Sequence, residues 1–129
     1  MFALGALHVF WAVRNRYTDS VMIPKVGGKP SFIPTRRSTV LVAVALFAGC
    51  TVALAQGHVI ETGAPAWLIQ GGAYVAGTMF ALRSIGEFRL VGFFKRVRGT
   101  DFARWDTWLF SPLSALIGSA FLYLAQLPR

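Results

Sequence analysis

The stretch RSIGEFRLVGFFKRVRGTDFARWD, from Arg83 to Asp106, decides how the rest of the chain is interpreted. It separates two apolar runs, Ala66 to Leu82 and Thr107 to Leu127. About 20 apolar residues in a helix span the hydrocarbon core of a bilayer, and each run is close to that length. Six of the 13 basic residues lie in the stretch between them. Apolar runs bordered by basic segments are typical of integral membrane proteins.

The composition favours the same class of protein. Of 129 residues, 55% are hydrophobic and only 14% are charged, whereas soluble domains carry about 25% charged residues. A soluble domain of this size has too little interior to bury so much apolar surface. The net charge of +8 gathers beside the apolar runs, which argues against nucleic acid as a partner and for anionic lipid headgroups. Cys50 is the only cysteine, so no internal disulfide can form.

We expect residues 1–129 to form one all-α domain, a polytopic membrane protein with a small bundle of four transmembrane helices. The helices are expected at about residues 2–17, 39–56, 65–87 and 106–127. The first apolar run, Phe2 to Val13, would rise only about 18 Å as a helix, which is short for a bilayer. A start of the natural chain upstream of Met1 is one explanation. A signal peptide is disfavoured because no basic segment precedes the run.

Local signals predict where the helices begin and end. Ser38 or Thr39 can cap the second helix, and Gly57 can terminate it. The Ser111-Pro112 pair predicts a kink near the start of the fourth helix, because proline lacks a backbone donor. These signals place the boundaries at the edges of the apolar runs.

The distribution of charge predicts the orientation of the chain. The linkers 14–37 and 83–106 each hold six basic residues, whereas the linker 56–65 holds none. With four crossings the two basic linkers lie on one side, and the positive-inside rule places them in the cytoplasm. We therefore expect a multi-pass protein of the inner (cytoplasmic) membrane with both termini outside. With three crossings, a basic linker would lie outside or the first run would stay peripheral.

Polar groups in or beside the apolar runs are the candidate functional residues. Gln70 and Tyr74 lie among small residues in the third helix, which favours close packing at the centre of the bundle. Arg83 and Glu87 are four residues apart, so we expect them to pair on one helix face. We interpret the pair as an interfacial salt bridge, with an ion pair beside a pocket as the alternative.

The first helix carries a second candidate pair. His8 and Trp11 are three residues apart and share one face of a helix. An intramembrane histidine is a candidate for proton transfer or for binding a metal or haem. No second cluster of ligand residues accompanies His8, so we predict no metal site and no cofactor.

Arg104 and Asp106 flank a tryptophan just before the fourth apolar run. Being two residues apart, they do not share a helix face. We therefore expect one of them to pair elsewhere, with Arg36 or Arg37 of the other basic linker or with Glu87. Asp106 is interpreted as a structural residue rather than a proton carrier.

An interfacial amphipathic helix is predicted from Arg89 to Gly99. Aromatic and aliphatic residues gather on one face of it, and basic residues cover the rest. Four basic residues are expected to contact lipid headgroups: Arg89, Lys95, Arg96 and Arg98. Thr100 or Asp101 is expected to cap the helical turn that follows.

Several of these motifs together resemble a bacterial family of small four-helix membrane proteins, known only as a domain of unknown function. The resemblance rests on Leu7-His8-x-x-Trp11, on residues 83–89 and 102–106, and on Ser111-Pro112. It covers nearly the whole chain. It implies an integral membrane protein with a longer first helix than is seen here, and it assigns no catalytic role to any residue.

The sequence contains no motif typical of a catalytic site. We expect a non-enzymatic protein, an accessory or structural subunit of a membrane complex or a homo-oligomer, with membrane lipids as further partners. One alternative is a small oligomeric transporter or channel. Its path would be lined by Gln70, Tyr74, Thr78 and the Arg83–Glu87 pair. The other is a lipid- or quinone-modifying enzyme that uses His8 or Glu87.

Overall fold

The computed structural model describes residues 1–14, 23–27, 29–31 and 33–128. Over these residues the fold is mostly helical, as expected, with one short hairpin added. The helices are α1 (Phe2–Arg14), α2 (Arg36–Gln56), α3 (Ala66–Ile85), α4 (Asp101–Trp105) and α5 (Ser111–Leu124). A π-helical turn, η1 (Asp106–Phe110), joins α4 to α5 in one continuous helix, Asp101–Leu124. The antiparallel strands are β1 (Lys25–Val26) and β2 (Lys29–Pro30).

The ends of α2 follow from local hydrogen bonds. The helix begins at Arg36, three residues before the expected start, because Thr35 caps it in place of Ser38 or Thr39. The Thr35 hydroxyl accepts a hydrogen bond from the Ser38 N–H at 3.1 Å, which satisfies a donor of the first turn. Gly57 is confirmed as the C-terminal cap.

The other helix bounds also differ from the expected ones. α3 ends at Ile85, because Gly86 follows it with a φ of 87°, a value outside the helical range. The fourth helix begins at Asp101, five residues early, since the Thr100 hydroxyl caps it. It ends three residues before the expected end. Residues 15–17 of the first expected helix lie outside the described residues.

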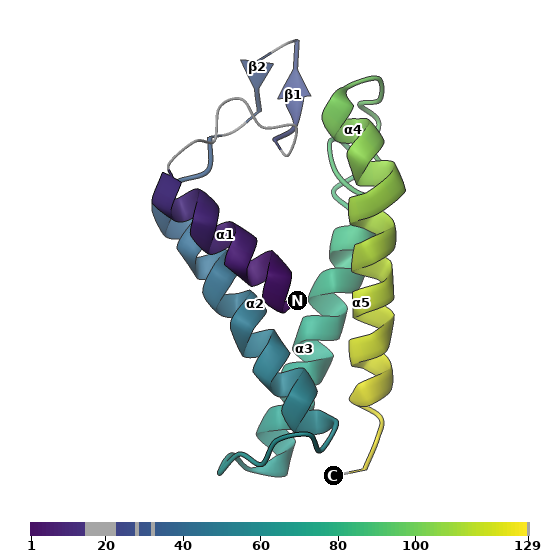
Figure 1. Ribbon diagram of the computed structural model, residues 1–129. Helices are drawn as coiled ribbons and strands as arrows, with labels where there is room; N and C mark the ends of the chain where they lie inside the picture. Colours follow the sequence, from purple (N-terminus) through teal and green to yellow (C-terminus); the bar gives the residue numbers. More distant parts are fainter. Residues whose placement is uncertain (15–22, 28, 32, 129) are drawn as a thin grey trace.

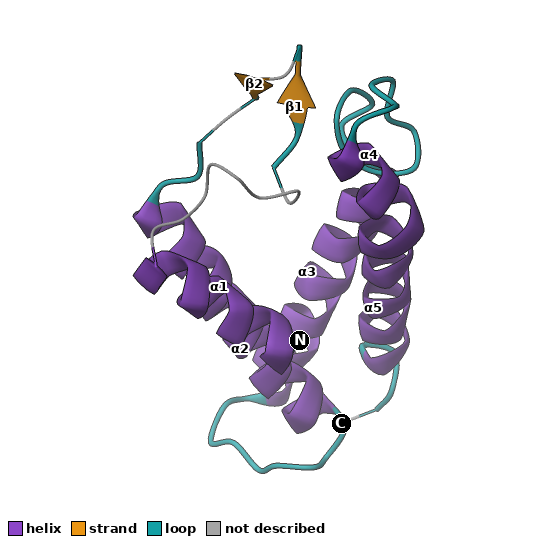
Figure 2. Ribbon diagram, turned by 45° about the horizontal axis from the view of Figure 1, so that its top comes forward, coloured by secondary structure: helices purple, strands orange, loops and turns teal. Residues whose placement is uncertain are grey.

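The helices form two antiparallel pairs, α1 with α2 and α3 with α5 (Figure 1). The pairs meet where the end of α2 approaches the start of α3, and they diverge toward the β hairpin (Figures 1 and 2). The buried core lies near this meeting point and contains Ala73, Phe121 and Ala125. Met1 packs against the same cluster, so the start of α1 lies beside the core.

Glycines allow α3 and α5 to approach closely. A Cβ atom at Gly77 would lie 2.7 Å from Cγ of Leu122, and one at Gly118 would lie 2.9 Å from the backbone nitrogen of Ala81. Neither distance leaves room for a methyl group. The third helix therefore packs against its neighbour through small residues, as its sequence predicted.

The outer faces of the long helices are apolar. Val13 on α1, Leu41 on α2 and Leu116 on α5 are each more than two-thirds exposed, and Val75 on α3 is 65% exposed. Within the described part of the chain, α2 and the helix Asp101–Leu124 are long and apolar enough to cross a membrane. α1 is apolar but shorter. Length and composition thus qualify two helices as membrane spans, fewer than the four expected from the sequence.

Both basic linkers lie at the same end of the helices. The described residues of the first linker and the loop 86–100 are found at one end, and the linker between α2 and α3 is at the other (Figure 1). Ile23 and Lys25 of the first linker line a cavity of about 50 Å³ together with Phe102 of α4. The two basic segments therefore meet in space.

Replacing Gly118 by alanine should destabilise the protein by about 1–3 kcal/mol, the usual cost of an extra methyl group in a packed contact. Gly71→Ala is the matched control, because a Cβ at Gly71 meets nothing within 4 Å and alanine favours the helix. Thermal unfolding of the purified chain in detergent measures both variants. Equal melting temperatures would contradict the close packing of α3 against α5.

Candidate functional site

Asp106 is the most deeply buried charged residue of the described chain, with an exposed fraction of 0%. Its Oδ1 accepts a hydrogen bond from Nη2 of Arg83 at 2.8 Å, and its Oδ2 accepts one from Nζ of Lys95 at 2.9 Å. Both are charge-assisted bonds, which are stronger than neutral ones. A carboxylate buried without such partners would cost several kcal/mol. The two cations are therefore what allows Asp106 to be buried.

Two neutral donors complete the surroundings of this carboxylate. The N–H of Gly92 donates to Oδ2 at 2.8 Å, and the hydroxyl of Ser111 donates to the same oxygen at 3.2 Å. An ionised carboxylate offers about four acceptor positions. With Arg83 and Lys95 included, the carboxylate accepts four hydrogen bonds, one at Oδ1 and three at Oδ2. All four donors belong to the chain itself, and the structural role interpreted for Asp106 from the sequence stays a prediction.

The π-helical turn explains how Ser111 reaches Asp106. In such a turn an N–H bonds to the carbonyl five residues earlier, and the Ser111 N–H bonds to the Asp106 carbonyl in this way. The wider turn brings residues five apart toward one face. It also lies directly before Pro112, whose ring would clash with a carbonyl of a regular α-helix. The irregularity expected at Ser111-Pro112 thus takes the form of a π turn. This turn supports the group formed by Asp106, Arg83 and Lys95, called the ion cluster below.

The loop 86–100 folds back onto the end of α3. Gly86 and Gly92 have φ values of 87° and 89°, a region that glycine adopts readily and other residues do not. Between these turns the chain reverses, and the Phe93 N–H bonds to the Ser84 carbonyl at 2.9 Å. The prediction of an amphipathic helix from Arg89 to Gly99 is therefore wrong. The turns at the glycines return the backbone to α3, and no helix forms in the loop.

Lys95 is buried in the cluster, with an exposed fraction of 3%. Its ammonium group donates to Asp106, to the Gly92 carbonyl at 3.0 Å and to the Thr107 hydroxyl at 2.7 Å. An ammonium group has three donors, so all of them are used. The expectation that Lys95 contacts lipid headgroups is wrong, because that placement assumed a helical periodicity that the loop lacks.

The predicted pairing of Arg83 with Glu87 is also wrong. α3 ends before Glu87, so no helix brings the two side chains together. Arg83 bonds to Asp106, while Glu87 is exposed and accepts a hydrogen bond from a backbone N–H of the loop at 3.0 Å. Asp106 likewise takes its partners from the end of α3 and from the loop, and not from Arg36, Arg37 or Glu87 as expected.

The other predicted headgroup residues remain at the surface. Arg89, Arg96 and Arg98 are exposed on the loop, and Arg104 is exposed on α4. Among the described residues none of these four guanidinium groups forms a salt bridge. The end of the molecule that carries the loop therefore has a surplus of positive charge.

His8 and Trp11 share one face of α1, as predicted, with ring centroids 5.2 Å apart. Nδ1 of His8 donates to the Leu4 carbonyl at 2.8 Å, a bond within the same helix. The residues that the structure describes contain no group of three His, Cys, Asp or Glu side chains suited to hold a metal ion. His8 is thus placed by its own helix and its aromatic neighbour.

At the other end of the molecule, two glutamines bond to the end of the chain. Gln70 donates to the Ala125 carbonyl at 2.9 Å. Gln56, which was not among the predicted functional residues, is fully buried and donates to the carbonyls of Leu124 and Leu127 at 3.0 and 3.1 Å. Its position at the end of an apolar run was the available signal. Tyr74, one turn after Gln70 in α3, is 44% exposed.

Comparison with known proteins gives one match. The model of the family described as "Protein of unknown function (DUF3995)" matches residues 1–121, which include every residue of the ion cluster. No curated protein and no solved structure matches the chain.

Asp106→Asn should destabilise the fold by about 3 kcal/mol, because it leaves the buried ammonium group of Lys95 without its anion. Glu61→Gln is the control, since Glu61 is an exposed acid in the linker at the opposite end. Melting temperatures in detergent report the difference. If the two substitutions have the same small effect, the ion cluster does not stabilise the fold.

Proposed function

The chain belongs to the DUF3995 family, and we propose that it is a small integral membrane protein that crosses the inner membrane four times. In this proposal it acts as an accessory or structural subunit of a membrane complex, or as a homo-oligomer, and catalyses no reaction. The observation that carries the proposal is the apolar outer surface of every long helix. Lipid replaces water as the solvent for such a surface, as the bilayer does for transmembrane helices.

The distribution of exposed side chains supports four crossings. Large apolar residues on α1 and α3 are exposed to the same degree as those on the two candidate spans, for example Phe10 at 50% and Met79 at 63%. In water each of these groups would lose the free energy of burial, about 25 cal/mol per Å² of apolar area. A bilayer removes that cost from all four helices at once.

Orientation follows from the end at which the basic segments gather. The first linker and the loop 86–100 share that end, so a membrane around the helices would hold both on one side. Basic loops are retained in the cytoplasm. Trp105 and Trp108 are exposed near this end, at 49% and 84%, which suits the aromatic belt at a membrane interface.

The ion cluster supports a structural role rather than catalysis. A general acid or base needs a lone pair or proton that a substrate can reach. The carboxylate of Asp106 is enclosed by four donors, and the ammonium group of Lys95 has no free N–H. Their geometry serves to hold the loop and two helices together.

Association with other subunits is supported by the face of α3 that points away from α5. Val75, Met79 and Leu82 are each more than half exposed there, and Gly71 has open space where a side chain would be. Close approach of a second helix is favoured at such a surface, because packing and not the hydrophobic effect drives helix association in lipid.

The proposed orientation predicts a labelling pattern in whole cells. In a Cys50→Ser background, a membrane-impermeant thiol reagent should label Gly63→Cys in the linker 56–65. It should not label Ser31→Cys in the first linker until the cells are opened. The reverse pattern would overturn the orientation, and labelling of both sites in intact cells would overturn the four crossings.

The proposed role predicts a complex larger than the 14.1 kDa chain after extraction in mild detergent. Crosslinking followed by gel filtration should recover this complex for the natural sequence, and Val75→Trp should reduce its yield about tenfold by blocking the α3 face. Leu116→Trp, on the exposed face of α5, is the matched control and should leave the yield unchanged. A lone monomer under all these conditions would contradict the proposed role.

A further inference from the structure

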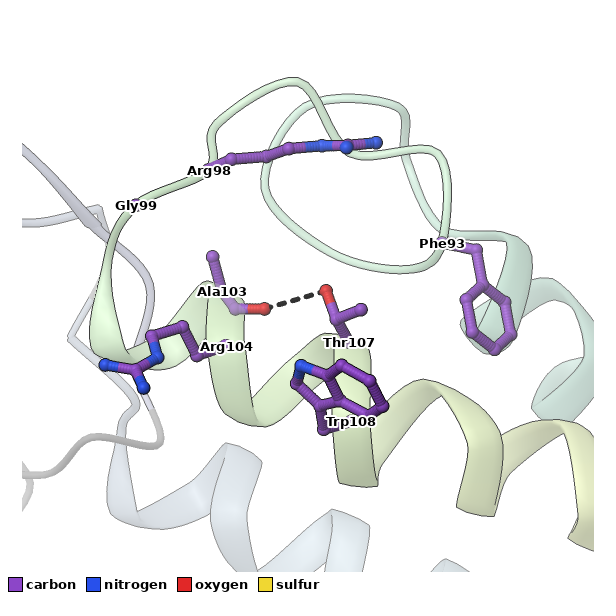
Figure 3. Close-up of a pocket in the computed structure, with 7 residues that line it drawn as sticks. All are labelled: Phe93, Arg98, Gly99, Ala103, Arg104, Thr107 and Trp108. Carbon is purple, nitrogen blue, oxygen red and sulfur yellow. Dashed lines mark hydrogen bonds between the residues drawn. The ribbon is translucent and has the colours of Figure 1, made fainter.

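A pocket of about 180 Å³ lies between the loop 86–100 and the start of the helix Asp101–Leu124 (Figure 3). Its lining residues come from the loop and from the first turns of the helix: Phe93, Arg98, Gly99, Ala103, Arg104, Thr107 and Trp108. The volume exceeds the share of one water molecule, about 30 Å³. The pocket therefore has room for a group of several heavy atoms.

The residues that line the pocket include two cations and no anion. The nearest exposed acid in the sequence is Asp101, which lines a neighbouring hollow together with Arg104. Arg98 and Arg104 are both exposed, and neither forms a salt bridge within the described residues. Asp106, which lies nearby in the sequence, is already occupied by Arg83 and Lys95. Figure 3 shows Arg98 along the loop and Arg104 on the helix, on different sides of the pocket. In Figure 3 the two guanidinium groups point away from each other, and Nε of Arg98 donates to the Lys95 carbonyl at 3.5 Å. Both side chains are exposed, so both can turn toward an anion in the pocket with their remaining N–H donors, and guanidinium is well suited to phosphate.

The remaining polar group in the pocket is already used. The Thr107 hydroxyl donates to the Ala103 carbonyl at 2.9 Å and accepts a hydrogen bond from Lys95. Figure 3 shows the bond between Thr107 and Ala103, and the bond from Lys95 links this wall of the pocket to the ion cluster. The recognition of an anion would therefore depend on Arg98 and Arg104.

An exposed apolar stripe begins at the pocket and follows the helix away from it. Trp108 is 84% exposed, and Leu116 and Tyr123 further along are 68% and 66% exposed. Pro112 is exposed between them. These residues follow one another at intervals of four or seven, so they stay near one face of the helix. A ligand with an anionic head and a long apolar tail matches a cationic pocket at one end of such a stripe.

We infer that this pocket binds the phosphate group of an anionic phospholipid, whose acyl chain lies along the stripe from Trp108 to Tyr123. The inference rests on the proposed membrane location and adds a specific partner to it. Arg98 and Arg104 bind the phosphate, and the aromatic side chains of Phe93 and Trp108 lie at the boundary between headgroup and acyl chain. Other arginines of the loop contribute only the general attraction of a basic surface to anionic lipid.

Native mass spectrometry of the delipidated full-length chain in detergent tests the inference. Phosphatidylglycerol is titrated as the anionic lipid, phosphatidylcholine as the zwitterionic lipid and glycerol 1-phosphate as the free headgroup. The natural sequence should bind phosphatidylglycerol at least tenfold more tightly than phosphatidylcholine. The pocket variant, Arg98→Gln with Arg104→Gln, should lose this preference.

The matched control is Arg89→Gln with Arg96→Gln, which removes the same charge from exposed positions outside the pocket. It should change the affinity by less than threefold. Equal losses in the two double variants would overturn the inference, because diffuse attraction would then explain the binding. Displacement of the lipid by glycerol 1-phosphate at comparable concentration would also overturn it, since the stripe would then contribute nothing.

Two further measurements keep the outcome clear. If the pocket variant unfolds in detergent, Arg98→Lys with Arg104→Lys replaces it. The lysine variant keeps the positive charge but lacks the planar fork of guanidinium N–H donors. Its affinity for phosphatidylglycerol should fall at least threefold. Undiminished binding by the lysine variant would reject recognition by guanidinium groups. Solubility of the natural chain without detergent would instead refute the membrane location itself, so failure of the pocket and failure of the proposed function are distinguished.

Discussion

Burial of the Asp106 carboxylate is the constraint around which this end of the molecule is organised. An anion removed from water must be matched by donors, or its burial costs more than the fold can supply. The donors come from the end of α3, from the loop 86–100 and from the first turn of α5. Satisfying one carboxylate therefore fixes three segments relative to one another. The π turn and the glycine turns are the local distortions that make this possible.

Hydrogen bonds at the end of the molecule opposite the ion cluster complete the pairing of α3 with α5. Close packing of the two helices between these ends also contributes. Gln70 of α3 and Gln56 of α2 bond to backbone carbonyls at the end of α5 and just after it. Between the two ends, Gly77 and Gly118 let the helix backbones approach. In lipid, apolar side chains gain little by leaving the solvent, so such contacts decide which helices associate. The proposed membrane location thus accounts for an interior that is partly polar beneath an apolar exterior.

The local features of the sequence predicted local structure well. Gly57 as a terminator, Thr100 as a cap and the shared face of His8 and Trp11 all depend on residues within one or two turns. Some errors were local, such as the cap of α2 at Thr35 in place of Ser38 or Thr39. The errors about which charges pair arose where a local rule was extended past a turn. The pairing of Arg83 with Glu87 assumed that α3 continued through Gly86, which has a conformation that ends a helix.

What the sequence by itself determined is the helical fold, the place of each long helix and the clustering of positive charge, because these follow from composition and short-range periodicity. The tertiary structure alone decided which charges are buried. The partners of Asp106 lie 23 and 11 residues away along the chain, and they reach it only because the loop folds back at two glycines. The tertiary structure also decided that Lys95 is buried while Arg98 is exposed. An irregular loop has no periodicity from which the direction of its side chains could be inferred.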